Sequence, residues 1–196
     1  IKEKEDKVML LFIITLLLMV VIIIYLIYFI LVKPTPVKYP MMEFLLHRPI
    51  AHRGLHNIQQ GVPENSLEAF RRAIQEDYPI ELDIHLSKDG EVVVFHDDDL
   101  TRMTGASGKI EEKSFAELAA LTLQNTQEYI PALKEVLQLV KGRVPLLIEF
   151  KNYTNGELEQ RAWEILKGYG GNFAVQSFDF RSVRWFRKKA PHVLRG

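Results

Sequence analysis

Residues 8–32 form an unbroken run of 25 residues without charge, proline or glycine. As an α-helix the run would be about 37 Å long, which is enough to cross a bilayer core of about 30 Å with some tilt. Tyr25 and Tyr28 lie toward one end, where aromatic side chains favour the membrane interface. A cleaved signal peptide would instead show a shorter apolar region and a small-residue cleavage site. We therefore expect a short tail over 1–7 and a retained single-pass membrane helix over 8–32.

The flanks of this helix carry equal numbers of basic residues, which are the residues that set orientation in a membrane. Three precede the helix and three follow it: Lys2, Lys4, Lys7, Lys33, Lys38 and Arg48. The sequence therefore leaves open on which side of the membrane the rest of the chain lies. Residues 33–48 begin with a proline-rich stretch and are expected to form a semi-rigid linker, with a short interfacial helix over 41–47.

From residue 49 onward, short apolar stretches alternate with stretches of helical periodicity. The expected strands cover 50–52, 80–86, 92–96, 146–150, 173–178 and 193–194. This alternation predicts parallel strands joined by right-handed helical crossovers, and both an α/β barrel and an open doubly wound sheet fit it. A complete barrel needs about 250 residues, so a barrel within 49–196 is expected to lack about two βα units at its C-terminus.

Capping signals place helices between these strands. Ser114 with a glutamate three residues later spells a capping box, and a similar signal opens a helix over 66–76. Pro131 suits the first turn of a helix that Gly142 can end. Two further helices are expected over 158–166 and immediately before Pro191.

Acidic and basic residues interrupt strands that should be apolar. Glu81, Asp83 and His85 share one face of the strand over 80–86, because side chains two apart point the same way. Carboxylates on the inner face of a covered parallel strand are costly to desolvate unless a cation compensates them. The same feature recurs where Glu149 and Lys151 share a face, and histidines and an arginine stand at two other strand ends.

Each of these residues has an ordinary structural explanation when taken alone. A lone histidine at a strand end, such as His52 or His96, is more often structural than catalytic. Glu149 and Lys151 also fit a simple ion pair. The acidic run 97–99 is expected to form a solvated turn or to cap a helix. The combination of all these residues in one domain is more specific than any of them.

Their chemistry is consistent with work on a phosphate ester. Three carboxylates, in a chain without cysteine, favour a hard divalent cation such as Mg²⁺ or Ca²⁺. Arg53 and Lys151 can offset phosphate charge, while His52 and His96 can share proton transfers. The chain has 25 acidic and 25 basic residues, so it has no strong field to attract nucleic acid, and no nucleic-acid partner is expected.

Ten short motifs follow one another along the chain. They are His52-Arg53-Gly54, Pro63-Glu64-Asn65-Ser66-Leu67-Glu68-Ala69-Phe70, Glu81-Leu82-Asp83, Lys88-Asp89-Gly90, Val93-Val94-Phe95-His96-Asp97, Leu100-Thr101-Arg102, Gly108, Ile130-Pro131-Ala132-Leu133, Glu149-Phe150-Lys151 and Gln176-Ser177-Phe178-Asp179. In order and approximate spacing they resemble the glycerophosphodiester phosphodiesterase family. The resemblance covers 49–196.

The resemblance implies a (β/α)8 TIM barrel that continues beyond residue 196, with a small insertion expected near 100–129. It also implies roles for the residues that match the family's motifs. The acid–base pair would be His52 and His96, the metal ligands Glu81, Asp83 and Glu149, and the phosphate-facing cations Arg53 and Lys151. Glu64 and Asn65 match a motif at the rim of the site, whereas His85 stands at a variable position and is expected to be structural.

The activity implied is hydrolysis of a glycerophosphodiester to an alcohol and sn-glycerol 3-phosphate, with a divalent cation as cofactor. In the family the glycerol 2-hydroxyl is thought to attack phosphorus, and water then opens the cyclic phosphate. Two alternatives remain open. One is a membrane-tethered phospholipase-like barrel enzyme, and the other is a non-catalytic module that binds glycerol phosphates.

Overall fold

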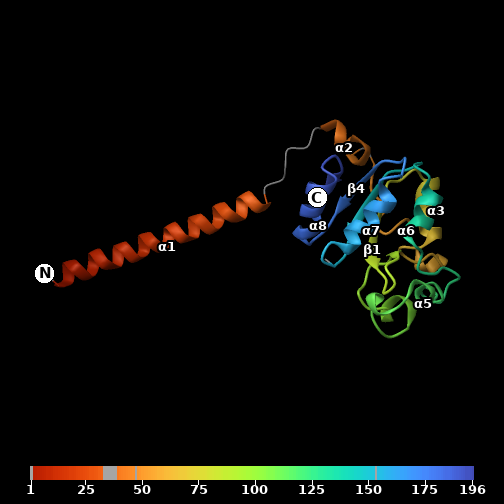
Figure 1. Ribbon diagram of the computed structural model, residues 1–196, viewed down its shortest axis with the longest axis horizontal. Helices are drawn as coiled ribbons and strands as arrows, with labels where there is room; N and C mark the ends of the chain where they lie inside the picture. The colour runs from red at the N-terminus through yellow and green to blue at the C-terminus, as the bar shows by residue number, and fades with distance from the viewer. Residues whose placement is uncertain (1, 33–38, 47, 153) are drawn as a thin grey trace. The chain divides into compact units, whose positions relative to one another are not determined.

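The computed structural model describes residues 2–32, 39–46, 48–152 and 154–196. They fall into two compact units, Ile1–Val37 and Lys38–Gly196. The first unit contains one long helix, α1 (Lys2–Val32) (Figure 1). Within α1, Lys4–Ile30 is long and apolar enough to cross a membrane, and its most apolar window is not buried by the described protein. A helix that is apolar on all sides is stable only in apolar surroundings.

The linker prediction can be compared with the structure only over residues 39–46 and 48. Residues 33–38 and 47 lie outside the described residues. The stretch between them is a helix, α2 (Tyr39–Leu46), which starts earlier than the interfacial helix expected over 41–47. Pro40 stands in the first turn of α2, where a missing backbone N–H leaves no helical hydrogen bond unmade.

Five strands form one sheet in the described part of the chain, in the order β2-β1-β3-β4-β5. Their bounds are β1 Ile80–Leu86, β2 Val92–Val94, β3 Leu146–Phe150, β4 Phe173–Gln176 and β5 Leu194–Arg195. β1, β3, β4 and β5 pair in parallel, as predicted from the alternation of strands and helices. The register sets Asp83 of β1 opposite Glu149 of β3, so both carboxylates stand at the same level of the sheet.

The helices beside the sheet follow the expected order (Figure 1). The helical segments are η1 Ile58–Gln60, α3 Leu67–Gln75, α4 Thr101–Thr104, η2 Ile110–Glu112, α5 Phe115–Ala119, α6 Leu133–Val140, α7 Glu157–Leu166 and α8 Phe180–Lys189. Ser66 caps α3 by accepting from the backbone N–H of Ala69, and Ser114 forms the expected capping box on α5. Pro131 lies just before the N-cap of α6 rather than in its first turn.

Two strand predictions hold only in part. The segment expected over 92–96 does contain a strand, β2, but it pairs with β1 in the antiparallel and not the expected parallel direction, with Ile84 opposite Val94. Only residues 87–91 connect β1 to β2, and a parallel crossover needs a dozen residues or more. The segment over 50–52 makes a single parallel bridge, Ala51 to Ile80, because the chain turns back at Gly54, whose N–H donates to the carbonyl of Ala51.

The apolar side chains divide into two clusters. The larger lies between the sheet and helices α3, α6, α7 and α8, and includes the fully buried Leu82, Ile148 and Phe186. The smaller cluster lies within the segment that follows β1. It contains Phe95, Leu100, Met103, Ile110, Leu118, Leu123 and Ile130. The stretch expected as an insertion near 100–129 therefore has its own small core.

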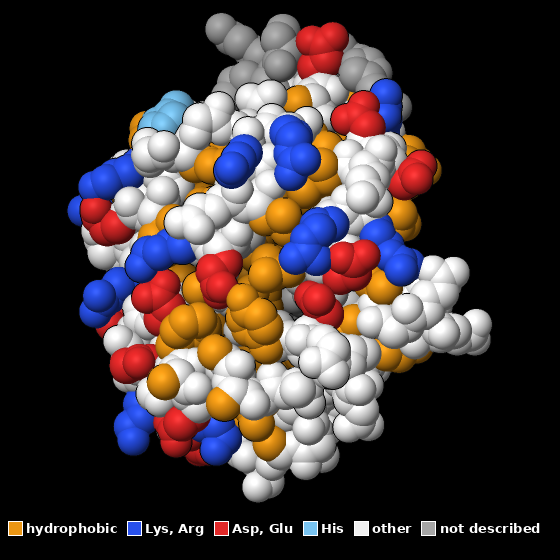
Figure 2. All heavy atoms as spheres, turned by 90° about the vertical axis from the view of Figure 1, so that its right-hand side faces the viewer, with side chains coloured by type: hydrophobic (Ala, Val, Ile, Leu, Met, Phe, Trp, Pro, Cys, Tyr) orange, Lys and Arg blue, Asp and Glu red, His pale blue; other side chains and the backbone are white. Residues whose placement is uncertain are grey.

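Charged side chains of both signs lie on the face of the molecule that Figure 2 shows. Acidic and basic groups are interspersed there around a central apolar area, as the equal totals of the two charges would give on a mixed surface. Such a surface favours solubility of the domain without a large field of one sign.

Replacing Leu82, which is fully buried in β1, tests the larger core. Leu82→Ala should lower the free energy of unfolding by about 2–5 kcal/mol, because it removes buried methyl groups and leaves a cavity. Urea denaturation followed by circular dichroism measures the loss. Ile58→Ala is the matched control, since this side chain is 46% exposed and should change stability by less than about 0.5 kcal/mol. Equal losses in both variants would contradict the assigned core.

Candidate metal and active site

Three carboxylates meet at one level of the sheet. Glu81 and Asp83 lie on the same face of β1, and the parallel register brings Glu149 of β3 beside them. All three residues are buried, with exposed fractions of 4%, 1% and 6%. One carboxylate oxygen from each lies within 4.8 Å of the others, which is close enough for a common cation. The structure thus brings together the three residues that the sequence predicts as metal ligands.

Two cations lie against this cluster. The Lys151 ammonium is 2.5 Å from a Glu149 oxygen and 3.1 Å from Asp83 Oδ1. The Arg53 guanidinium is 3.5 Å from Asp83 Oδ2, and the Arg53 backbone N–H donates to Glu81 Oε2 at 2.9 Å. Both residues predicted to face a phosphate are therefore next to the carboxylates, where they offset part of the negative charge.

The neighbouring motif supports the cluster from one side. Asn65 is buried and donates through Nδ2 to Asp83 Oδ2 at 2.9 Å. Glu64 Oε1 accepts from Arg53 at 3.0 Å and from Arg102 at 2.6 Å. Asn65 and Glu64 thus contact other residues of the site, Asp83 in one case and Arg53 and Arg102 in the other.

The donor set fits a hard divalent cation. Glu81 Oε1 is buried and accepts no hydrogen bond from the described residues, and Asp83 Oδ1 is buried with the Lys151 ammonium 3.1 Å away, so both keep coordinating capacity. All three candidate ligands are carboxylates, which suits Mg²⁺ or Ca²⁺ better than softer metals. Burial, followed by the charge of Asp83, raises the pKa of Glu81 to about 7. A divalent charge at this position would oppose that shift by favouring the ionised carboxylate.

His52 lies beside the cluster on the chain turn after Ala51. Its Nε2 is 4.0 Å from Glu81 Oε2, and its side chain is 67% exposed. Partial burial and the charge of Arg53 lower the pKa of His52. The imidazole is therefore neutral near pH 7 and can accept a proton.

His96 follows β2, and a chain of ion pairs fixes its ring. His96 Nδ1 is 2.6 Å from Asp97 Oδ1, and the Arg102 guanidinium contacts both oxygens of Asp97 at 2.5 and 3.0 Å. The hydrogen bond from Arg102 lowers the pKa of Asp97 to about 2, so this carboxylate stays ionised beside the imidazole. Arg102 also reaches Glu64, which links His96 to the Arg53 side of the site.

Three residues of the site, Asp97, Arg102 and Gln176, receive no functional role from the sequence alone. Asp97 is not part of a solvated turn, although Asp99 does accept from the backbone N–H of Thr101 as a cap would. Arg102 stands in the motif Leu100-Thr101-Arg102, but the sequence alone assigns no role to its guanidinium. Gln176, the first residue of the motif Gln176-Ser177-Phe178-Asp179, donates to Glu149 Oε2 at 3.3 Å from the end of the strand next to β3.

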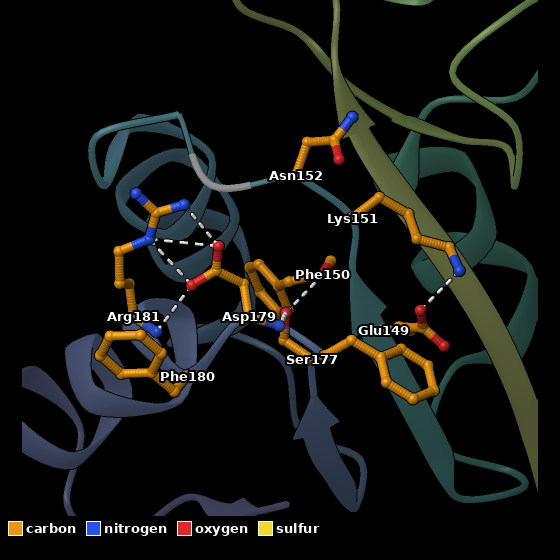
Figure 3. Close-up of a pocket in the computed structure, with 9 residues that line it drawn as sticks. Glu149, Phe150, Lys151, Asn152, Ser177, Asp179, Phe180 and Arg181 are labelled. Carbon is orange, nitrogen blue, oxygen red and sulfur yellow. Dashed lines mark hydrogen bonds and ion pairs between the residues drawn. The ribbon is translucent and has the colours of Figure 1, made fainter.

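Open space adjoins the cluster on two sides. A cavity of about 760 Å³ is bordered by β3 and the start of α8. Figure 3 shows Lys151 directed toward Glu149 on one side of it and the Asp179–Arg181 pair on the other. A second hollow of about 720 Å³ is lined by His96, Arg102 and again Lys151. Lys151 therefore borders both spaces, each large enough for a small-molecule substrate.

Comparisons with known proteins agree on one family. Residues 52–195 match the Glycerophosphoryl diester phosphodiesterase family. A glycerophosphodiester phosphodiesterase of Caldanaerobacter subterraneus is 34% identical over 161 residues, which cover 75% of this chain and 64% of that relative. The human protein named lysophospholipase D GDPD1 is 31% identical over 155 residues, which cover 72% of this chain and 48% of that protein.

Solved structures give the same result. A phosphodiesterase of Oleispira antarctica, in complex with the product sn-glycerol-3-phosphate, superposes with a TM-score of 0.68 at 31% identity, over 75% of this chain and 64% of that one. A glycerophosphodiester phosphodiesterase of Thermotoga maritima gives a TM-score of 0.62 at 34% identity, over 76% and 62% of the two chains. The chain spans less than two thirds of the length of each of these four proteins.

The turn that carries His52 and Arg53 depends on Gly54. Its φ is 81°, and a Cβ there would lie 2.8 Å from the Cβ of Ala69. Backbone strain alone costs about 1–3 kcal/mol. Gly54→Ala should destabilise the domain by more than this, because of the added clash. It should also weaken metal binding, because it moves Arg53. Gly61→Ala is the matched control, because Gly61 has a φ of 72° but nothing within 4 Å of the added Cβ. Denaturation midpoints and calorimetry with Ca²⁺ measure both effects, and equal behaviour of the two variants would contradict the steric argument.

The raised pKa of Glu81 predicts how stability depends on pH in the metal-free protein. Between about 4.5 and about 7 the folded state keeps a proton on Glu81 that the unfolded state has released. Rising pH therefore favours unfolding across this window, by on the order of 3 kcal/mol in total at about 1.4 kcal/mol per pKa unit.

Chemical denaturation at a series of pH values, with a chelator present, measures this slope. Glu81→Gln should flatten it, because the amide does not titrate. Glu164→Gln, on the exposed side of α7, should leave it unchanged. A slope that persists in Glu81→Gln would show that another group is responsible.

Proposed function

This chain belongs to the Glycerophosphoryl diester phosphodiesterase family, whose fold is the (β/α)8 TIM barrel, and we propose that it takes part in hydrolysing glycerophosphodiesters to an alcohol and sn-glycerol 3-phosphate. The single observation that carries the proposal is the convergence of Glu81, Asp83 and Glu149 beside His52. The product bound to the Oleispira antarctica relative, sn-glycerol-3-phosphate, supports the substrate class.

A divalent cation, Ca²⁺ or Mg²⁺, is the proposed cofactor. Glu81, Asp83 and Glu149 would hold it through one oxygen each. When bound, such an ion polarises a phosphoryl oxygen and helps to orient the substrate. Arg53 and Lys151 would then face the phosphate and offset its charge, since both already lie at the surface of the carboxylate cluster.

Glu64 and Asn65 support these residues. Glu64 is anionic and would repel a phosphate, so its contribution is to fix the Arg53 guanidinium through the 3.0 Å ion pair. Asn65 fixes the Asp83 carboxylate in the same indirect way. We therefore assign both as positioning residues rather than as groups that touch the substrate.

The two histidines divide the proton transfers. His52, neutral near pH 7, takes the proton from the attacking hydroxyl as that oxygen bonds to phosphorus. His96, whose ring is held by Asp97 through Nδ1, gives a proton to the departing alcohol oxygen as its bond to phosphorus breaks. When the glycerol 2-hydroxyl is the attacking group, the product is a cyclic phosphate, and water opens it with the two histidines exchanging roles.

The proposed location is a membrane, with α1 as a retained single-pass anchor. The length and apolar composition of Lys4–Ile30 support it. A membrane-anchored enzyme would also meet lysophospholipids, and this second candidate substrate is favoured by relatives named lysophospholipase D. Comparing the rates of hydrolysis of glycerophosphocholine and lysophosphatidylcholine in detergent distinguishes the two candidates.

His52→Ala provides the test of the catalytic proposal. Release of choline from glycerophosphocholine by the intact protein should fall by about 10²–10⁴-fold, the usual contribution of a general acid or base. A chelator should abolish the reaction, and added Ca²⁺ or Mg²⁺ should restore it. His56→Ala, an exposed neighbour, is the control and should retain full activity.

Two outcomes would overturn the proposal. Full activity of His52→Ala would contradict the role of His52 as proton acceptor. Full activity after verified metal removal would contradict the role of the divalent cation. Binding of sn-glycerol 3-phosphate without turnover of any phosphodiester would instead support a non-catalytic binding module.

A further inference from the structure

His85 is a buried imidazole to which the proposed reaction gives no role. It lies on β1, two residues after Asp83, and is 6% exposed. Its Nε2 is 3.1 Å from the backbone carbonyl oxygen of His96. A carbonyl oxygen can only accept, so Nε2 must carry the hydrogen and donate it. The contact therefore joins β1 directly to the residue proposed as the general acid.

The hydrogen bond from His85 to the His96 carbonyl lies just beyond the end of the β1–β2 pairing. The antiparallel pairing of β1 with β2 continues as far as Phe95, whose N–H donates to the carbonyl of Asp83 at 3.0 Å. In the part of the chain that the structure describes, this is the last backbone hydrogen bond between the segment and β1. At the next residue, His96, the side chain of His85 replaces the backbone ladder.

His96 is thus fixed at two points. Asp97 fixes the ring through Nδ1, and His85 fixes the backbone from which that ring extends. Asp97 follows His96 directly in the chain, so it fixes the ring relative to its own segment and, through Arg102 and Glu64, to the Arg53 side of the site. The His85 contact ties the His96 backbone itself to β1, the strand that carries Glu81 and Asp83, one residue beyond the bond from the Phe95 N–H.

We infer that His85 is a positioning residue, which holds the backbone of His96 at a fixed distance from the carboxylate cluster so that the imidazole meets the substrate phosphate. The inference deepens the proposed function and rests on it. A displacement of about 1 Å in a catalytic group can slow a reaction by about 100-fold, so a contact of this kind is sufficient to matter.

Simple core packing does not account for His85. Its ring borders a small cavity of about 30 Å³ that is also lined by Asp98, Lys109 and Asn152, so one side of the ring faces polar groups. An apolar side chain would fill the space but would leave the His96 carbonyl without its donor. A donor at the position of Nε2 is therefore the requirement, and glutamine is the residue that best reproduces it.

Three variants of the intact protein separate positioning from packing. His85→Leu removes the donor, His85→Gln keeps an amide N–H near the position of Nε2, and His85→Asn carries an amide too short to reach the carbonyl. His85→Leu and His85→Asn should lower kcat on glycerophosphocholine by about 10- to 100-fold, with KM changed less than about threefold. His85→Gln should retain most of the wild-type kcat. The control is His192→Leu, which removes an imidazole that packs on Trp163.

A spectroscopic measurement keeps the inference independent of turnover. The chain has six histidines, so selective ¹⁵N labelling of the rings can resolve the Nδ1–H of His96 bonded to Asp97. That proton should exchange with water faster in His85→Leu and His85→Asn than in the wild type, and at the wild-type rate in His85→Gln.

The outcomes are distinct. Wild-type kcat in His85→Asn, or an equal loss in folded His85→Gln and His85→Asn, would overturn the inference. If His85→Leu fails to fold, the comparison of glutamine with asparagine still decides it. If the wild-type protein hydrolyses no glycerophosphodiester, the proposed function fails, and unchanged proton exchange in His85→Asn would reject the positioning role separately.

Discussion

The fold has to keep three buried carboxylates together. Asp83 and Glu149 face each other across a parallel pair of strands. Glu81 lies on the same face of β1, two residues before Asp83. Burial alone would drive such groups apart or into their protonated forms, because the charged state loses its hydration. Lys151 and Arg53 oppose this with ion pairs. A cluster of this kind contributes little to stability, and its presence is understandable as preparation for a cation.

The backbone around the cluster carries strain of its own. Arg53 and Asn65 adopt left-handed conformations, with φ values of 56° and 53°, and the Asn65 N–H donates to the Arg53 carbonyl at 2.9 Å. Left-handed geometry is unfavourable for residues with a side chain, and non-glycine examples gather at functional sites. The side chains of both these residues contact Asp83, as the Lys151 ammonium also does. The strain thus serves to aim a guanidinium and an amide at one carboxylate.

Much of the site could be predicted from local pattern. The two-residue period of a strand sets Glu81 and Asp83 on one face, and parallel pairing of neighbouring apolar segments brings Glu149 to them. The antiparallel direction of β2 could also have been predicted from the sequence, because five connecting residues cannot make a parallel crossover. The alternation of strands and helices instead favoured a parallel pair. The partners of Asp97 and Gln176 could not be predicted, since several basic or acidic groups were available to each, and only the packed fold selects Arg102 and Glu149.

The second apolar cluster has a consequence for how the site could fail. His96 belongs to a segment that folds around Phe95, Leu100 and Ile110, whereas the carboxylates stand on strands of the larger core. Regions with separate cores can open with different free energies. A local opening of the smaller cluster would withdraw the proposed proton donor while leaving the three carboxylates assembled. Heat or denaturant would then separate the proposed cation site from the proposed activity, and the two properties would melt as separate transitions.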